Sequence, residues 1–173
     1  MNEYESGTRK NIPAVLMYAR HGDRILMIHR DAAERANTDY HSGKWNGLGG
    51  KQEAGESAFE AASREFAEEA GVMLPSTKFE ALGVLQFPNF KSHKNEDWTV
   101  FVFTAELSPS EAGGIQATSD EGSLHWIPAK DLLKLNLWPG DRYFIPFVVD
   151  QTPFVGTIWY QGSEVIRQDV RGL

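Results

Sequence analysis

The sequence contains no cysteine, which excludes disulfide bridges and thiolate metal sites. It also lacks long apolar runs: stretches such as residues 99–105 have the length of a strand and are too short to span a bilayer. The first ten residues are polar and include acids, unlike a secretory signal. The formal net charge is −7, whereas proteins that bind long nucleic acids usually carry a basic face. These absences favour a cytoplasmic protein that binds neither a membrane nor long nucleic acid.

What remains is an ordinary globular composition over 173 residues, with 41% hydrophobic and 24% charged residues. This length suits one hydrophobic core, and no internal repeat or shift in composition marks a second unit. We therefore expect a single domain over residues 1–173.

Strand-like and helical segments follow one another irregularly along the chain. Strands are expected at residues 13–18, 24–29, 79–87, 98–107, 123–127, 154–160 and 164–170. Helices are expected at residues 128–135 and 140–149, and surface loops at residues 31–44 and 108–121. Because a strict βαβ alternation is missing, the pattern favours an α/β sandwich with a mixed sheet over a doubly wound fold.

The best-defined helix is expected at residues 58–70. Ser57 and Glu60 have the spacing of a capping box at its start, and Gly71 predicts a Schellman-type end. Four apolar residues recur at helical spacing and should form its buried stripe: Phe59, Ala62, Phe66 and Ala70.

Three acids of this helix, Glu65, Glu68 and Glu69, share one face because they stand at positions i, i+3 and i+4. Each pair at ~4 Å costs about 1 kcal/mol in bulk water and about 4 kcal/mol at an effective dielectric constant of about 20. A partly buried triad would therefore raise its pKa values or recruit a cation, and carboxylate oxygens suit the hard ions Mg²⁺ and Mn²⁺. The ordinary alternative is a solvated face with salt bridges. The helix contains no lysine, however, and Arg64 is its only base.

A glycine-rich segment, residues 45–50 (WNGLGG), precedes the helix. Three glycines in four positions indicate a turn with special backbone geometry, which brings backbone atoms against a ligand. A solvated helix does not need such a turn, so this segment favours the cation-site interpretation.

Residues 50–72 resemble the Nudix box, G-x5-E-x7-R-E-U-x-E-E-x-G-U, in which U is apolar, and every fixed position is filled. The resemblance implies a Nudix-type α/β/α sandwich with a mixed β-sheet. It also implies an enzyme that uses Mg²⁺ or Mn²⁺ to split a phosphoanhydride bond of a nucleoside di- or triphosphate derivative. In this family the metal ligands are the three box glutamates and a glycine carbonyl, while the first box glutamate pairs with the arginine. The corresponding residues here are Glu65, Glu68, Glu69 and Gly49 as ligands, and Glu56 with Arg64 as the pair.

The similarity extends beyond the box to the MutT-homologue branch, which hydrolyses oxidised purine nucleoside triphosphates. Residues 45–51 (WNGLGGK), 119–121 (SDE) and 137–146 (LWPGDRYFIP) each resemble segments of that branch. The resemblance implies a purine pocket made by Asn46, Trp138 and Asp141, with Phe87 as a further lining residue. It also places Glu121 near the metal ions.

Two of these assignments keep an ordinary alternative. Lys51 either meets a phosphate or remains a solvated surface lysine, and Trp138 either stacks on a base or packs in the core. The small basic loop formed by Lys91, His93 and Lys94 either reaches phosphates or is solvated.

The chain departs from the branch at two positions next to the expected base pocket. Where the branch has two adjacent acids after W-P, this chain has Gly140 and then Asp141, and Phe144 replaces a tryptophan. One base-reading group is therefore missing, which leaves the choice between oxidised and normal purines open. The loop at residues 31–44 is also longer than in the branch.

The implied mechanism is attack on phosphorus by a water molecule that a glutamate, Glu68 or Glu121, deprotonates. A triphosphate would yield a nucleoside monophosphate and pyrophosphate. The box also occurs in nucleoside-diphosphate-sugar and dinucleoside-polyphosphate pyrophosphatases, which are the main alternatives. A non-catalytic nucleotide sensor is disfavoured because all the box glutamates are present. A monomer and a homodimer are both compatible with the sequence, and His29, His41, His93 and His125 lack metal-ligand spacing.

Overall fold

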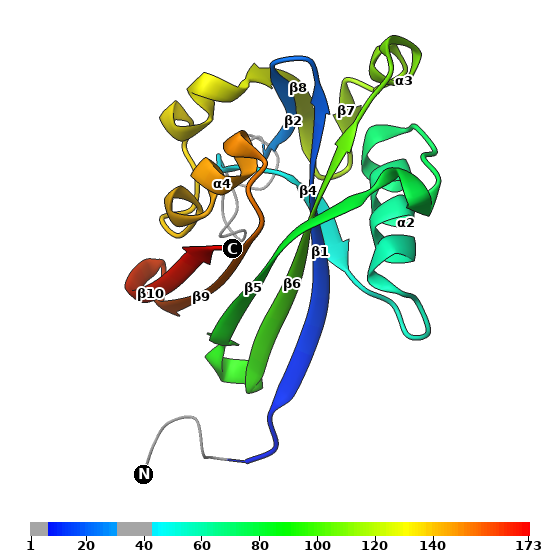
Figure 1. Ribbon diagram of the computed structural model, residues 1–173. Coiled ribbons are helices and arrows are strands. Elements are labelled where there is room, and N and C mark those ends of the chain that lie inside the picture. Colours follow the sequence, from blue (N-terminus) through cyan, green and yellow to red (C-terminus); the bar gives the residue numbers. More distant parts are fainter. Residues whose placement is uncertain (1–6, 31–42) are drawn as a thin grey trace.

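The computed structural model describes residues 7–30 and 43–173, so most of the expected loop at residues 31–44, with His41, lies outside the described residues. Figure 1 shows a twisted sheet with helical segments on both sides. The strands are β1 (Lys10–His21), β2 (Arg24–His29), β3 (Trp45–Asn46), β4 (Leu48–Lys51), β5 (Glu80–Lys91), β6 (Glu96–Glu106), β7 (Thr118–Ser119), β8 (Gly122–Pro128), β9 (Phe154–Gln161) and β10 (Glu164–Gly172). The α-helices are α2 (Ala58–Ala70), α3 (Pro109–Gly113) and α4 (Ile145–Asp150), and the 3₁₀ helices are η2 (Ser76–Lys78), η3 (Ser92–Lys94), η4 (Ala129–Lys134) and η5 (Asp141–Tyr143).

The sheet has the order β10-β9-β5-β6-β1-β2-β8-β7, with β4 added beside β1 and β3 beside β2. The pairs β1–β6 and β5–β9 are parallel, while the hairpins β1–β2 and β9–β10 are antiparallel. The expected mixed sheet is therefore confirmed.

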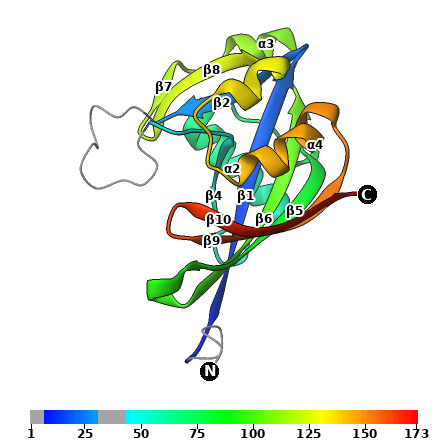
Figure 2. The same cartoon turned by 90° about the vertical axis from the view of Figure 1, so that its left-hand side faces the viewer.

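Two hydrophobic clusters lie on opposite faces of this sheet. Successive residues of a strand point to opposite faces, and β1 follows this rule: Val15 and Met17 belong to the cluster under α2, whereas Ala14 and Tyr18 belong to the cluster under α4. Figures 1 and 2 show α2 on one side of the sheet and α4, with the segments before it, on the other. This layering is the predicted α/β/α sandwich.

Helix α2 begins and ends close to the predicted residues. The Ser57 hydroxyl accepts the Glu60 N–H at 3.2 Å, and the Glu60 carboxylate accepts the Ser57 N–H at 2.7 Å, which completes the predicted capping box. Gly71 ends the helix at φ 74°, and its N–H donates to the Ala67 carbonyl. This single bond is the αL motif rather than the predicted Schellman motif.

The predicted buried stripe of α2 is wrong at one position. Ala62, Phe66 and Ala70 are buried, but Phe59 is 42% exposed and keeps one edge against the Phe103 ring, at 5.0 Å between centroids. Phe59 lies in the first turn, where burial depends on what covers the end of the helix, and helical spacing carries no information about that.

Three other expectations need correction. The expected loop at residues 108–121 contains α3 and β7, and α3 begins with a capping box of Ser108 and Glu111. The expected helix at residues 128–135 is the 3₁₀ helix η4. The expected helix at residues 140–149 is divided into η5 and α4, because Pro146 stands in the first turn of α4, where its missing N–H is not needed, and so begins a helix instead of kinking one.

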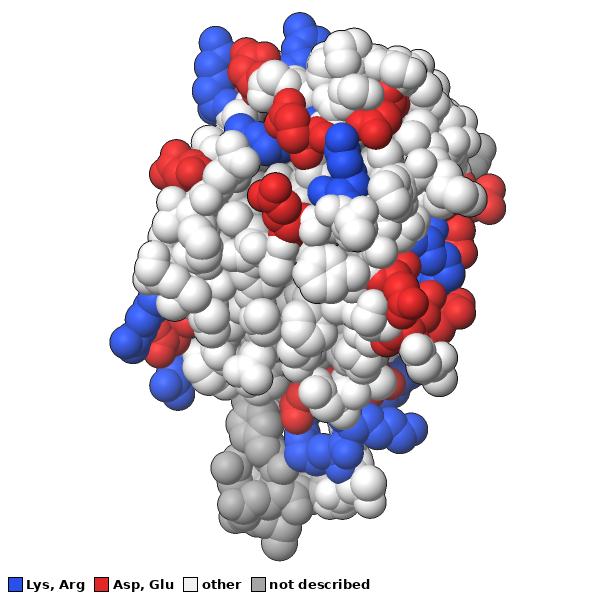
Figure 3. Space-filling view, turned by 45° about the vertical axis from the view of Figure 1, so that its right-hand side comes forward, with Lys and Arg blue, Asp and Glu red and all other residues white. Residues whose placement is uncertain are grey.

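No helix in the described part of the chain is both long and apolar enough to cross a bilayer. On the face shown in Figure 3, Lys and Arg side chains lie among Asp and Glu side chains and form no continuous basic surface.

Candidate active site

The glycine-rich segment before α2 forms strand β4 and not the predicted turn. Leu16 pairs with Gly49, and Val15 pairs with Gly50, in an antiparallel ladder. Neither glycine has a positive φ, so the expected special backbone geometry is also wrong. The glycines are required by space: a Cβ at Gly49 would overlap the Val15 carbonyl oxygen and lie 3.1 Å from the Leu16 Cα.

Gly50 lets the backbone of β4 pack directly against a carboxylate of α2. A Cβ at Gly50 would lie 2.6 Å from Oε2 of Glu65 and would overlap the rest of that carboxyl group. The strand and the glutamate helix are therefore joined at a close contact, and a side chain at position 50 would displace the Glu65 carboxylate.

The three glutamates of α2 differ in burial. Glu69 is 5% exposed and accepts the Gly49 N–H at 3.1 Å, while the side chains of Glu65 and Glu68 are 14% and 59% exposed. Burial raises the pKa of Glu69 to about 8, and the charges of Glu65 and Glu121 add to this rise. Burial also raises the pKa of Glu65. The predicted shared face therefore stands at the border of the core, with Glu69 on the inner side and Glu68 in solvent.

Arg64 holds the loop before α2 against the helix. It donates to the Glu56 carboxylate, at 2.9 Å between Nη2 and Oε2, and to the Lys51 carbonyl at 3.1 Å. The hydrogen bonds that Glu56 accepts from Arg64 and from the Glu53 N–H lower its pKa to about 2. Arg64 also contacts Glu65 at 2.9 Å and Glu68 at 3.5 Å. The predicted pairing of Glu56 with Arg64 is present.

The carboxylates around β4 offer the donor chemistry of a hard divalent cation. All the candidate ligands are oxygen atoms, and Glu69 is buried with no ion pair among the described residues. Within residues 7–30 and 43–173, however, no three Asp, Glu, His or Cys side chains already form a metal-binding group. The residues therefore fit Mg²⁺ or Mn²⁺ by chemistry, while Glu65 and Glu68 are engaged with Arg64.

Glu121 lies at the bend between β7 and β8 and forms an ion pair with Arg30 at 2.7 Å. Arg30 and Gly49 line the same pocket, and the buried Nε atom of Arg30 has no hydrogen-bond partner within residues 7–30 and 43–173. Its charge lowers the pKa of Glu69, opposing the effect of burial. The sequence analysis identified Glu121 and missed Arg30, whose positive charge acts on the buried Glu69.

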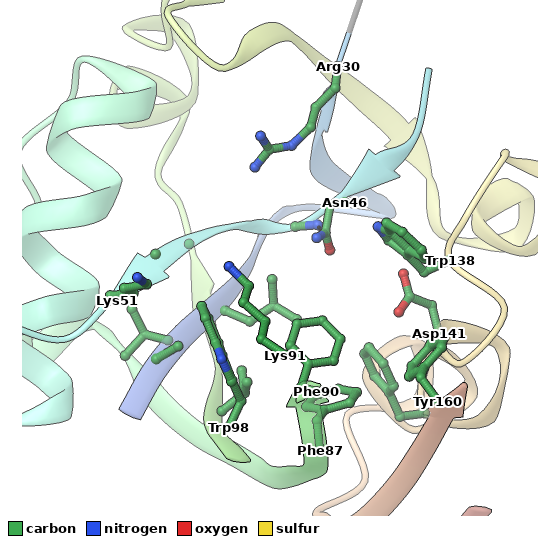
Figure 4. Close-up of a pocket in the computed structure, with 18 residues that line it drawn as sticks. Arg30, Asn46, Lys51, Phe87, Phe90, Lys91, Trp98, Trp138, Asp141 and Tyr160 are labelled. Atoms are coloured by element: carbon green, nitrogen blue, oxygen red, sulfur yellow. Dashed lines mark hydrogen bonds between the residues drawn. The ribbon is translucent and has the colours of Figure 1, made fainter. Parts of the chain in front are cut away.

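A pocket of about 260 Å³ opens beside β4. Figure 4 shows Lys51 and Trp98 at one end of it, and Trp138, Asp141 and Tyr160 at the other. All five residues predicted to bind the substrate line this pocket: Asn46, Lys51, Phe87, Trp138 and Asp141. The predicted ligand Gly49 lines it too, so the structure joins segments that lie far apart in the sequence.

At the far end from the glutamates, the pocket is aromatic with one buried acid. Trp138 is only half-buried and meets Tyr160 edge-on, with 6.2 Å between ring centroids, so core packing does not account for it. Asp141 is 8% exposed, and its buried Oδ2 atom has no hydrogen-bond partner in the part of the chain that the structure describes. Burial raises the pKa of Asp141 to about 7, partly offset by a hydrogen bond to the Trp138 backbone and by the charge of Lys44.

The pocket also contains residues that sequence reasoning did not assign to it. Trp98 of β6 lies between two lysines, with Nζ of Lys51 at 5.5 Å and Nζ of Lys91 at 5.0 Å from its ring centroid. Tyr160 of β9 and Phe90 of β5 complete the wall. The basic character of residues 91–94 was the available signal for Lys91. No local pattern distinguishes Trp98 or Tyr160 from other aromatic strand residues.

A family model described as the NUDIX domain matches residues 8–148 of this chain. The chain is 28% identical to the oxidized purine nucleoside triphosphate hydrolase of Mus musculus over 142 residues, which cover 82% of this chain and 86% of that protein. It is 32% identical to a Nudix hydrolase of Bacillus subtilis (strain 168) over 128 residues, covering 73% of this chain and 72% of that protein. Among solved structures, the MutT protein of Bacillus halodurans is similar with a TM-score of 0.76 and 25% identity, covering 92% of this chain and 97% of that one.

Proposed function

From the premise that this chain belongs to the Nudix hydrolase family, we propose that it is a Mg²⁺-dependent nucleoside triphosphate pyrophosphohydrolase. The proposed substrate is a purine nucleoside triphosphate of the dGTP or 8-oxo-dGTP type. The proposed products are the nucleoside monophosphate and pyrophosphate. The relatives named as oxidized purine nucleoside triphosphate hydrolases support this substrate class.

One observation carries the proposal: a single pocket connects an aromatic end with a buried acid to the glycine strand that contacts the glutamates of α2. Trp138 offers a plane for stacking, while Asp141 and Asn46 offer polar groups for a purine edge. At the other end, Lys51 and Gly49 lie where β4 reaches Glu65 and Glu69. A nucleoside therefore fits one end and its phosphates the other.

The phosphate end combines negative carboxylates with positive side chains. Glu65, Glu68 and Glu69, with the Gly49 carbonyl, would hold the cation, which when bound supplies Lewis-acid neutralisation of the phosphate oxygens. Lys51, Lys91 and Arg30 are the cationic side chains of the pocket wall and would bind the remaining phosphate charge. They orient the triphosphate in an otherwise acidic protein.

The general base has two candidates, Glu68 and Glu121. Glu68 is exposed and shares Arg64 with Glu65 and Glu56, whereas Glu121 is held by Arg30. Each would accept the proton of the attacking water molecule and is already positioned by an arginine. The pH–rate profiles of Glu68→Gln and Glu121→Gln distinguish them. The acidic limb, along which the rate falls because the base is protonated, should be lost only in the variant that lacks the base.

The test is hydrolysis of a panel of substrates, with and without Mg²⁺, followed by chromatographic identification of the products. The panel holds dGTP, 8-oxo-dGTP, the other nucleoside triphosphates, nucleoside-diphosphate sugars and dinucleoside polyphosphates. The proposal expects the highest kcat/KM for a purine triphosphate. A preference for a nucleotide sugar or a dinucleoside polyphosphate would favour the corresponding pyrophosphatase. Binding of nucleotides without turnover of any substrate would favour a nucleotide sensor.

A further inference from the structure

Gly140 occupies a position at which the backbone does not need glycine. Its φ of −71° and ψ of −23° are ordinary right-handed helical values that any residue adopts. The constraint comes from space instead, because a Cβ at Gly140 would overlap the Tyr160 hydroxyl oxygen and lie 3.1 Å from the Tyr160 Cζ. Because Gly140 has no side chain, the hydroxyl group of Tyr160, on strand β9, fits against it.

The Tyr160 hydroxyl is held firmly in that space. Its oxygen accepts the Gly140 N–H at 2.7 Å, and its ring packs edge-on against Trp138 and at 6.2 Å from Phe87. A phenol has one proton to donate as well as lone pairs to accept with. In the described part of the chain, the Gly140 bond is the one hydrogen bond of this hydroxyl, so its proton has no acceptor in the protein.

Asp141, the next residue, presents a second unsatisfied group at the same end of the pocket. The residue is buried, and its Oδ2 atom has no hydrogen-bond partner among the described residues. Figure 4 shows Trp138, Asp141 and Tyr160 together at this end, with the Asp141 carboxylate turned into the pocket. A buried polar atom without a partner is costly, so an O–H donor beside such an atom indicates a ligand with complementary polar groups.

We propose that Tyr160 is a specificity-determining residue that reads the nucleobase together with Asp141. The Tyr160 O–H donates to an acceptor on the base edge, a carbonyl oxygen or a ring nitrogen, and Asp141 bonds the neighbouring N–H or amino group. Gly140 is the positioning residue for the hydroxyl. This inference rests on the proposed nucleotide site. The Tyr160 hydroxyl takes the place of the base-reading acid that the related branch has at the position of Gly140.

The two groups differ in how they respond to pH. Burial and the nearby charge of Asp141 raise the pKa of Tyr160, so the phenol stays protonated and remains a donor at every working pH. Asp141 exchanges its proton near neutrality, and Lys44 is the cationic group that acts on it. Tyr160 is therefore always a hydrogen-bond donor, whereas Asp141 donates when it is protonated and only accepts when it is ionised.

The test removes the hydroxyl and keeps the ring. Tyr160→Phe should lower kcat/KM for dGTP about fivefold to tenfold, mainly through KM, which is the usual loss for one neutral hydrogen bond. It should weaken dGMP binding by the same factor in calorimetry. Hydrolysis of an abasic deoxyribose triphosphate and binding of inorganic tripolyphosphate should stay unchanged, because neither has a base. Tyr143→Phe is the matched control, since Tyr143 is exposed and does not line the pocket.

Gly140→Ala provides the second variant. In the wild-type background it displaces the hydroxyl and should reproduce the base-dependent loss. In the Tyr160→Phe background the clash with the oxygen is gone, so the same change should cost less than threefold. The non-additivity measures the coupling between the two positions.

Two results would overturn the inference: unchanged affinity for dGMP in Tyr160→Phe, or an equal loss for the abasic triphosphate, which would assign the hydroxyl a structural role. Failure of the proposed function has a different signature. In that case the wild-type protein itself would bind neither dGTP nor dGMP in calorimetry.

Discussion

The two ends of the pocket are built in different ways. The cation-binding part of the phosphate end comes from one short stretch of chain, in which Gly49, Gly50 and Glu65–Glu69 lie within about one strand, one loop and one helix. The base end comes from four separated segments, which contribute Asn46, Phe87, Trp138 with Asp141, and Tyr160. A local motif can therefore specify the cation-binding part, whereas Arg30, Lys91 and the base end join it only after the sheet has formed.

This difference has a chemical consequence. A divalent cation needs oxygen ligands at a constant spacing, and a helix provides that spacing by its geometry alone. A nucleobase needs planes and hydrogen-bonding groups from several directions, which separate strands and loops supply. The predictions below separate the two ends by asking which substitutions affect every phosphoanhydride substrate and which affect only those with a base.

The largest effect is expected at the phosphate end. Glu69→Gln keeps the shape of the buried side chain and removes its charge, so kcat should fall by about three orders of magnitude. The loss should be the same for dGTP and for an abasic triphosphate. Thermal unfolding should show that the variant is folded and that Mg²⁺ no longer raises Tm.

Glu60→Gln is the matched control on the same helix. Glutamine also serves in a capping box, so this variant should retain the cap and the activity. Full activity in Glu69→Gln would contradict the assignment of the glutamate helix to the phosphate end.

The next effect concerns the buried acid at the base end. The pKa of Asp141 is raised from 3.8 to about 7, so the folded protein retains a proton that the unfolded chain loses. The wild-type free energy of unfolding should therefore fall as pH rises from about 4 to about 7. At about 1.4 kcal/mol per pKa unit, this decrease is on the order of 3–4 kcal/mol.

Asp141→Asn removes this contribution, so denaturant titrations should show a flatter pH dependence than in the wild type. Glu69, whose pKa is also raised, contributes equally to both proteins, so the difference between the two curves isolates Asp141. Parallel curves would show that the Asp141 carboxyl is charged in the folded protein.

A smaller effect is expected where the strand meets the helix. Gly50→Ala places a methyl group against the Glu65 carboxylate and should displace it, lowering kcat tenfold to a hundredfold for substrates with and without a base. Gly113→Ala, at a glycine with nothing within 4 Å of an added Cβ, should have no effect. A loss of activity confined to substrates with a base would contradict the assignment of Gly50 to the phosphate end.

The smallest effect is expected from the aromatic plane. Trp138→Leu should raise KM for dGTP about tenfold, as base–aromatic stacking accounts for about 1–3 kcal/mol. Its kcat for dGTP and its kinetics with an abasic triphosphate should remain at wild-type values. Steady-state kinetics with both substrates would check this, and a loss of kcat with both would place Trp138 at the phosphate end.

Several elements of the fold followed from local signals. The capping box of α2 depends on residues three positions apart, so it acts in the same way in a peptide and in the folded protein. The same signals also mark α3, where Ser108, Pro109 and Glu111 have the spacing of a cap, although the glycine and serine content of residues 108–121 suggested a loop.

The errors arose where tertiary packing decides. The glycines of residues 47–50 indicated a turn by composition, but their reason is the contact of β4 with β1 and with Glu65, which no local rule contains. The exposure of Phe59 depends on what covers the first turn of α2.

The amino-acid sequence by itself determined the glutamate helix and its cap, because helical periodicity and capping act over a few residues. Only the tertiary structure brought Tyr160 of β9 to Gly140 and buried Asp141 beside them. The physical reason is that a hydroxyl and a carboxyl acquire their hydrogen-bonding role and their pKa from neighbours, and these neighbours come from distant parts of the chain.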